Sequence, residues 1–143
     1  MNDIVEVMLY VKNVDAEAKF WQNIGFSLIE AGKIGNYSFA KVSPTDNSSL
    51  TLCIYDIEFI KENSPEVADN VPSIMFHSND IDSLRSKMIN LNITVGDLQK
   101  MGDTKYLTSK ILMIYTLLFL ANKKGLSNES PFCLLNTINN SPS

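Results

Sequence analysis

Few side chains in this sequence of 143 residues could carry out chemistry. It contains one histidine, His77, and two cysteines, Cys53 and Cys133, which lie too far apart to form a metal-ligand motif. A single histidine cannot serve both a catalytic triad and a proton shuttle. The sequence also lacks G-x-S-x-G, G-x-G-x-x-G and P-loop motifs. We therefore expect no catalytic residues, and we expect Cys53, which lies in an apolar segment, to be a buried and unreactive thiol.

The composition is that of a globular domain with no nucleic-acid or membrane partner. Hydrophobic residues make up 45% of the chain, charged residues 20%, and the net charge is −4. Nucleic acids and anionic membrane surfaces attract basic proteins, so neither is an expected partner. The apolar run 111–121 is too short to span a bilayer. Two isolated cysteines and an N-terminus without signal-peptide features favour the cytoplasm.

The first half of the chain predicts the element order β-α-β-β-β. Residues 4–11 are rich in apolar residues and partly alternate, as expected of a strand. Asn13 can cap a following helix, whose apolar side contains Trp21 and which Gly25 can end. Turn residues then separate three further predicted strands, at 27–32, 37–43 and 49–57.

The second half begins the same order again. Residues 73–78 predict a strand, and Asp80 can cap a helix with apolar residues at helical spacing. Two short strands are predicted next, at 93–99 and 103–107. Residues 58–72 read as a connector with one helical turn.

An internal repeat is the simplest explanation of this order. When the chain is shifted by 67 residues against itself, Asn13 falls on Asp80 and Trp21 on Met88. Apolar residues meet apolar residues without a gap from Val7 to Leu28. The sequence therefore predicts two copies of one supersecondary unit.

Two consecutive βαβββ units in a chain of this size resemble the vicinal oxygen chelate superfamily, which includes glyoxalase I, bleomycin-resistance proteins, fosfomycin-resistance enzymes and extradiol dioxygenases. The resemblance is carried by LYVKNVDAEAKFWQNIGFSLIE at 9–30 and PSIMFHSNDIDSLRSKMINLNITV at 72–95. It implies an α+β fold in which two βαβββ modules form a curled mixed sheet around a cleft. The second module is expected to be incomplete or altered.

The resemblance also implies a domain organisation. We expect one domain over 1–124, followed by a weakly ordered tail at 125–143. Within the domain, module one covers 3–57, a linker 58–72 and module two 73–124.

In the superfamily, a divalent metal, where present, is held by four inward side chains, two from each module. On this sequence the first position falls on Glu6 and its counterpart in module two on Ser73. The fourth-strand position falls near Thr51 or Cys53. One carboxylate without an imidazole makes a poor metal site. We therefore expect no metal and no other cofactor, with a solvent-facing role for Glu6 as one alternative.

The resemblance favours metal-independent small-molecule binding of the bleomycin-resistance type, by a homodimer. Ligand contacts are expected from strand and helix side chains, namely Glu6, Met8, Tyr10, Trp21, Thr51, Cys53, Ser73 and Met75. For Trp21 the alternative is core packing, and His77 is expected to be an exposed polar residue. Other candidate functions are a metal-dependent glyoxalase or dioxygenase, a catalytically dead relative of one, and a structural or regulatory module without a ligand.

The end of module two departs from the superfamily pattern. The expected last strand contains a D-P motif and a metal ligand, whereas residues 107–121 read LTSKILMIYTLLFLA. Reading the codons of 107–116 one nucleotide earlier permits Y-F-K-D-P-D-D-I-Y-F, which is close to the expected motif. A frameshift is thus one hypothesis. A divergent ending, in which the apolar run forms a buried strand or a short helix, is the other.

Overall fold

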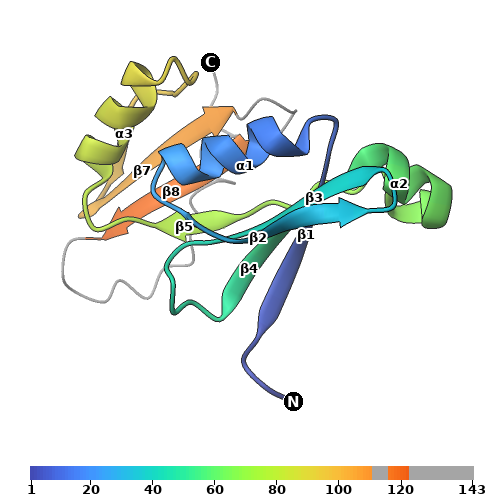
Figure 1. Cartoon of the computed structure of the whole chain (residues 1–143). Coiled ribbons are helices and arrows are strands. Elements are labelled where there is room, and N and C mark those ends of the chain that lie inside the picture. Colours follow the sequence, from blue (N-terminus) through green and yellow to red (C-terminus); the bar gives the residue numbers. More distant parts are fainter. Residues whose placement is uncertain (111–115, 123–143) are drawn as a thin grey trace.

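The computed structural model describes residues 1–110 and 116–122, which form two four-stranded sheets with three α-helices (Figure 1). The first unit consists of β1 (Val5–Val11), α1 (Val14–Asn23), β2 (Ser27–Ile34), β3 (Tyr37–Ser43) and β4 (Leu50–Asp56). A connector follows, containing α2 (Ile57–Asn63) and a 3₁₀ helix (Pro65–Val67). The second unit consists of β5 (Met75–His77), α3 (Ile81–Asn90), β6 (Gln99–Met101), β7 (Thr104–Lys110) and β8 (Thr116–Asn122).

Both sheets have the same topology. The strand order is β1-β4-β3-β2 in the first sheet and β5-β8-β7-β6 in the second. In each sheet the first strand pairs with the last in parallel, and the other neighbours are antiparallel. The predicted α+β fold with mixed sheets and two equivalent modules is therefore confirmed. The second sheet is smaller, because β5 and β6 have only three residues each.

The repeat extends to individual turn residues. Asn13 and Asp80 cap the two long helices, each accepting a backbone hydrogen bond from the residue three positions on, at 3.0 Å. The residues that end these helices, Gly25 and Asn92, both have positive φ, 112° and 58°. Gly35 and Gly102, with φ of 59° and 58°, are the first residues of the two tight hairpin turns. Each of these pairs is offset by 67 residues, so the predicted repeat is confirmed.

The predicted strand at 93–99 is wrong over most of its length. Only Gln99–Met101 forms β6, and Val95 makes an isolated bridge. The Arg85 side chain donates to the carbonyl oxygen of Gly96 at 3.1 Å, which binds this loop to α3, and the Gly96 NH donates a single bond to the Thr108 carbonyl oxygen on β7 at 2.9 Å. The connector is also more helical than predicted, because Asp56 caps α2 through the backbone NH of Glu58.

Part of the apolar run near the end of the chain forms a strand. β8 lies between β5 and β7, in the place that β4 occupies in the first sheet. For residues 116–122 the predicted strand is thus confirmed and the short-helix alternative is wrong. The predicted tail at 125–143 lies outside the described residues. Within the described part, no helix is both long and apolar enough to cross a membrane.

One hydrophobic core joins the two modules around Trp21, which is 1% exposed. Its ring contacts Phe26 at 4.7 Å and Phe76, on β5, at 5.7 Å between centroids. Phe26 and Phe76 also meet edge-to-face at 5.1 Å. Such aromatic contacts bury large apolar areas and add specific ring geometry. The first strand of module two is thereby attached to the helix of module one.

Glu17 is the one acidic side chain buried in this core within the described residues. It is 3% exposed, and its carboxylate accepts a hydrogen bond from the Trp21 indole Nε1 at 3.1 Å. Burial raises the pKa of Glu17, and the bond from Trp21 only partly opposes this shift. The folded state therefore binds the Glu17 proton more tightly than the unfolded chain does.

A Glu17→Gln substitution tests this linkage. A raised folded-state pKa means that the contribution of Glu17 to stability is full below its ordinary value of 4.5 and is lost as pH rises through the folded-state pKa. As pH rises through that range, wild type loses this contribution and Glu17→Gln does not. We therefore expect the free energy of unfolding of Glu17→Gln, measured with urea, to increase relative to that of wild type. The amide still accepts the Trp21 bond, whereas Glu17→Leu leaves the indole NH unpaired and should be about 1–3 kcal/mol less stable than Glu17→Gln.

The exposed Glu66→Gln serves as the control and should follow the wild-type profile. A difference between Glu17→Gln and wild type that stays constant with pH would contradict the assigned role of Glu17.

Candidate functional site

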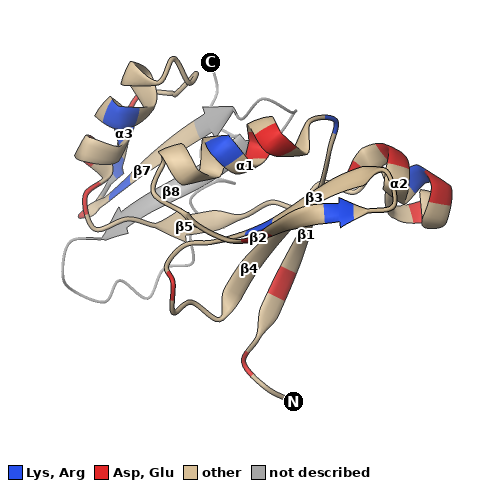
Figure 2. Ribbon diagram, viewed as in Figure 1, with Lys and Arg blue, Asp and Glu red and all other residues tan. Residues whose placement is uncertain are grey.

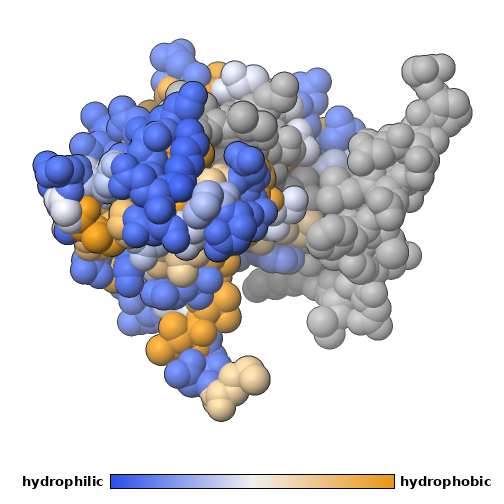
Figure 3. Space-filling view, turned by 90° about the vertical axis from the view of Figure 1, so that its right-hand side faces the viewer, coloured by the Kyte–Doolittle hydropathy of each residue, from blue (hydrophilic) through white to orange (hydrophobic). Residues whose placement is uncertain are grey.

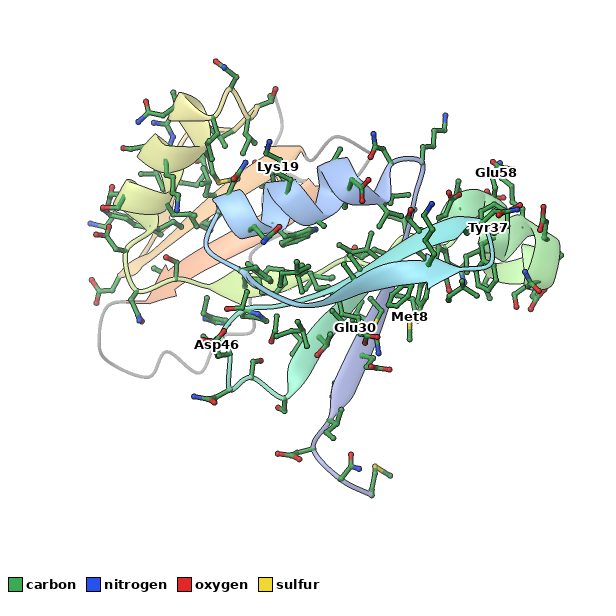
Figure 4. All side chains as sticks on the ribbon, viewed as in Figure 1. Met8, Lys19, Glu30, Tyr37, Asp46 and Glu58 are labelled. Atoms are coloured by element: carbon green, nitrogen blue, oxygen red, sulfur yellow. The ribbon has the colours of Figure 1, made fainter. Side chains whose placement is uncertain are left out.

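The first sheet has one face covered by α1 and one that α1 leaves open. Core residues such as Leu9, Val42 and Leu52 point toward α1 and are almost fully buried. Because side chains alternate along a strand, the residues between them point to the other side. We call this side the open face; its residues are Glu6, Met8, Tyr10, Glu30, Phe39, Lys41, Thr51, Cys53 and Tyr55. Figure 4 shows Met8 and Glu30 on the side of the sheet away from α1, which carries Lys19.

Strand register brings most of the predicted residues together. β1 and β4 pair so that Glu6 lies beside Thr51 and Met8 beside Cys53. Tyr10 lies beside Tyr55 in the same ladder. The sequence prediction thus selected neighbouring residues of one surface.

Three predicted residues are placed differently. Trp21 is a core residue on the covered side of the sheet, 1% exposed, which agrees with the core-packing alternative. Ser73 precedes β5 and is exposed, and Met75 is half-buried in β5, so both belong to the second module. His77, also on β5, is exposed as expected.

A charged triplet lies on the open face. Lys41 on β3 reaches Glu6 on β1 at 3.3 Å and Glu30 on β2 at 3.8 Å. The hydrogen bond that Lys41 donates to Glu6 raises the pKa of Lys41, so its ammonium is charged at neutral pH. Partly exposed ion pairs contribute little stability because water and salt screen them. The main effect of the triplet is to fix three charges, with a net charge of −1, on an otherwise largely uncharged surface.

Cys53 lies on the open face but its side chain is fully covered. Burial raises its thiol pKa from 9.0 to about 11, and the nearby Glu6 carboxylate acts in the same direction. The thiol is therefore protonated at neutral pH and unreactive, as predicted. Its predicted ligand contact is wrong, because no part of the side chain is accessible.

A row of aromatic rings continues the open face toward α2. We call Tyr37, Phe39, Tyr55 and Phe59 the aromatic row. Ring centroids lie 6.3 Å apart for Phe39 and Tyr55, 6.4 Å for Tyr55 and Phe59, and 5.8 Å for Tyr37 and Phe59. All four residues are half-buried. Burial is the main cause that raises the pKa of Tyr55.

Sequence reasoning missed the aromatic row and Lys41. The signal was present, because YSFAKVS alternates and places Tyr37, Phe39 and Lys41 on one side of β3. Which side faces α1 depends on the pairing of β3 with β4. In that pairing Phe39 lies beside Tyr55, and Lys41 beside Cys53.

The open face does not fit the metal that the superfamily resemblance implies. Its possible donors include the carboxylates of Glu6 and Glu30, both already paired with Lys41, and the neutral hydroxyl of Thr51. A divalent cation there would have to displace the Lys41 ammonium and would find no imidazole. Among the described residues, no group of three or more His, Cys, Asp or Glu side chains is placed to hold a metal ion.

A shallow pocket at the start of α3 is a weaker candidate. Three of its charged groups already have partners: Lys105 bonds to Asp82 at 2.8 Å, and Asp80 accepts two hydrogen bonds from Ser83. The lining is mostly polar and consists of Asn79, Asp80, Ile81, Asp82, Lys100, Asp103 and Lys105. Organic ligands favour apolar concave sites with few polar groups, which this pocket is not.

Comparison with known proteins identifies the fold. No family model and no curated protein matches the sequence. Among solved structures, TnmS3, an antibiotic binding protein from Streptomyces, superposes with a TM-score of 0.69, 10% identity and coverage of 86% of this chain and 98% of that chain. A member of the glyoxalase/bleomycin resistance protein/dioxygenase superfamily from Sphaerobacter thermophilus has a TM-score of 0.66, 12% identity and coverage of 83% and 96%.

A lactoylglutathione lyase from Agrobacterium tumefaciens gives a TM-score of 0.61, with 17% identity and coverage of 87% of this chain and 97% of that chain. The chain has the vicinal oxygen chelate fold. The predicted resemblance is thus confirmed for the architecture. Proteins with this fold include both a binding protein and a lyase, so activity has to be argued from the site.

The burial of Cys53 predicts slow alkylation. In a Cys133→Ser variant Cys53 is the only thiol, and iodoacetamide reacts with the thiolate. The shift from 9.0 to about 11 lowers the thiolate fraction roughly a hundred-fold, so native protein should react at least that much more slowly than protein in urea. Mass spectrometry of timed samples measures both rates.

A triple variant, Cys53→Ser, Cys133→Ser and Asn47→Cys, is the control, because residue 47 lies in an exposed loop. Its thiol should react at similar rates in both conditions. Equal alkylation rates of Cys53 in native protein and in urea would show that its side chain is not buried in the folded state.

Proposed function

We propose that this protein binds a small organic molecule on the open face, without a metal or other cofactor. The observation that carries the proposal is the combination of half-buried aromatic and apolar side chains with one fixed charged triplet. Binding sites for small molecules are typically apolar surfaces with a few well-placed polar groups. Met8, 37% exposed, and Tyr10, half-buried, add apolar area beside the triplet.

The fold supports a binding role of the bleomycin-resistance type. TnmS3, with the same fold, is described as an antibiotic binding protein. The alternative, a metal-dependent enzyme such as a lyase or dioxygenase, requires donors that the described open face lacks. We further propose that residues 1–124 form a single domain and that the protein is cytoplasmic. The core that joins both modules supports the single domain.

A Met8→Asp substitution tests the site. An uncharged compound found by thermal-shift screening and present at a hundred times its Kd should stabilise wild-type protein by about 2.7 kcal/mol. A carboxylate at position 8 places an unpaired charge in the apolar contact, so we expect this stabilisation to fall by more than half. Ile89→Asp, at a similarly exposed apolar position on α3, is the matched control and should retain the full response.

The same thermal-shift measurement after dialysis against EDTA separates the two functions. Metal-independent binding predicts an unchanged response. Loss of the response with EDTA, restored by Fe(II), Mn²⁺, Ni²⁺ or Zn²⁺, would favour the enzyme alternative. An unchanged response in Met8→Asp would place the ligand elsewhere.

We also propose that the protein is a homodimer. β1 is an edge strand of the first sheet, and its N-terminal end exposes Ile4 (66%) and Val5 (52%). Figure 3 shows apolar surface near this end of the molecule. Exposed apolar edges favour association, and two-fold dimers are the most common closed assembly.

Sedimentation should give the mass of two 16.0 kDa chains for the wild-type protein. The double variant Ile4→Lys, Val5→Lys should shift the measured mass toward that of one chain. A monomeric wild-type protein would contradict the proposal.

A further inference from the structure

Acidic groups surround the aromatic row at both ends. At one end lies the triplet, in which two carboxylates share one ammonium. At the other end Tyr37 donates a hydrogen bond to Glu62, and Lys61 pairs with Glu58 at 2.9 Å. Figure 2 shows acidic residues concentrated on α2. The five carboxylates of this surface belong to Glu6, Glu30, Asp56, Glu58 and Glu62.

The charge balance of this surface is therefore negative. Five carboxylates against the ammonium groups of Lys41 and Lys61 leave a net charge of −3. Lys33 lies opposite Ser38 in the β2–β3 ladder, so it belongs to the side of the sheet that α1 covers. The hydrogen bond to Glu62 is the main cause that raises the pKa of Tyr37, followed by burial, and the charges of Glu62, Asp56 and Glu58 act in the same direction.

Two neighbouring pairs of rings in the row are only moderately tilted. Phe39 and Tyr55 differ by 30° and Tyr55 and Phe59 by 31°, whereas Tyr37 and Phe59 differ by 51°. A flat molecule can stack on the accessible part of one such ring and contact its neighbour. The face of an aromatic ring carries partial negative charge and attracts cations, and nearby carboxylates act in the same direction.

We infer that the ligand of the open face is a flat aromatic cation, which stacks on Phe39 and Tyr55 and directs its positive charge toward Glu6 or Glu30. This inference rests on the proposed function and specifies its ligand class. An anion of the same shape would meet repulsion from both ends of the row, and the ammonium groups of Lys41 and Lys61 are already paired with carboxylates. A flat neutral molecule would gain the stacking but not the charge attraction.

Three acridines of one ring system separate these contributions. At about pH 8, 9-aminoacridine is a cation, acridine is neutral and acridine-9-carboxylate is an anion. Isothermal titration calorimetry should show the cation binding about tenfold tighter than the neutral compound, with the anion weakest. Added salt should reduce the difference between cation and anion, because it screens exposed charges.

Two variants assign the effect to residues. Glu30→Gln, at a side chain that is 55% exposed, should narrow the ratio between cation and anion affinity several-fold. Tyr55→Leu should weaken all three compounds, because it removes the stacking surface. Asp15→Asn, on the first turn of α1 at the covered side of the sheet, changes the net charge equally and should leave the ratio unchanged.

The outcomes distinguish this inference from the proposed function. An anion that binds as tightly as the cation, or a ratio equally affected by Asp15→Asn and Glu30→Gln, would overturn the ligand class and leave binding at the open face intact. Absence of saturable binding by all three acridines would also overturn the ligand class. The Met8→Asp thermal-shift experiment decides the proposed function independently of these compounds.

Discussion

The packing of Trp21 is the interaction on which the rest of the structure depends. Its ring lies between α1 and β5, and it contacts aromatic side chains from both modules. This contact keeps α1 on one side of the first sheet, and so it also determines which face remains open. The hydrogen bond to Glu17 fixes the orientation of the indole at the cost of a buried carboxyl group. The open face is thus a consequence of a packing interaction on the opposite side of the sheet.

Much of the fold was predictable because local signals and the repeat agreed. Asn13 and Asp80 were found as caps from residue type alone, and apolar spacing located both long helices. The paired turn residues Gly25 and Asn92 show why the shift of 67 residues works: both leave a helix in the left-handed conformation. The loop at 93–98 was not predictable, since its conformation depends on Arg85, which reaches it from α3.

The candidate site was only half predictable for a related reason. Strand alternation assigns residues to two faces, but it does not say which face a helix covers. The residues on β1 were found through the superfamily resemblance, whereas Lys41 and Tyr55 become neighbours of β1 only through the register of β3 and β4. Trp21 could be a ligand contact or a core residue by sequence, because a large aromatic side chain on a helix suits both. Burial alone separates these possibilities.

The alternation of strands also explains how this fold accommodates different chemistry. In β4, Leu52 and Ile54 are fully buried toward α1, while Thr51 and Tyr55, which flank the segment 52–54, are only half-buried on the open face. A substitution on one face leaves the packing of the other largely intact, so the core can be kept while the open face changes. On the open face of this chain, the Lys41 ammonium pairs with the Glu6 carboxylate at 3.3 Å. Since the ammonium comes from the chain itself, the charge arrangement of the open face is built by folding and requires no external ion.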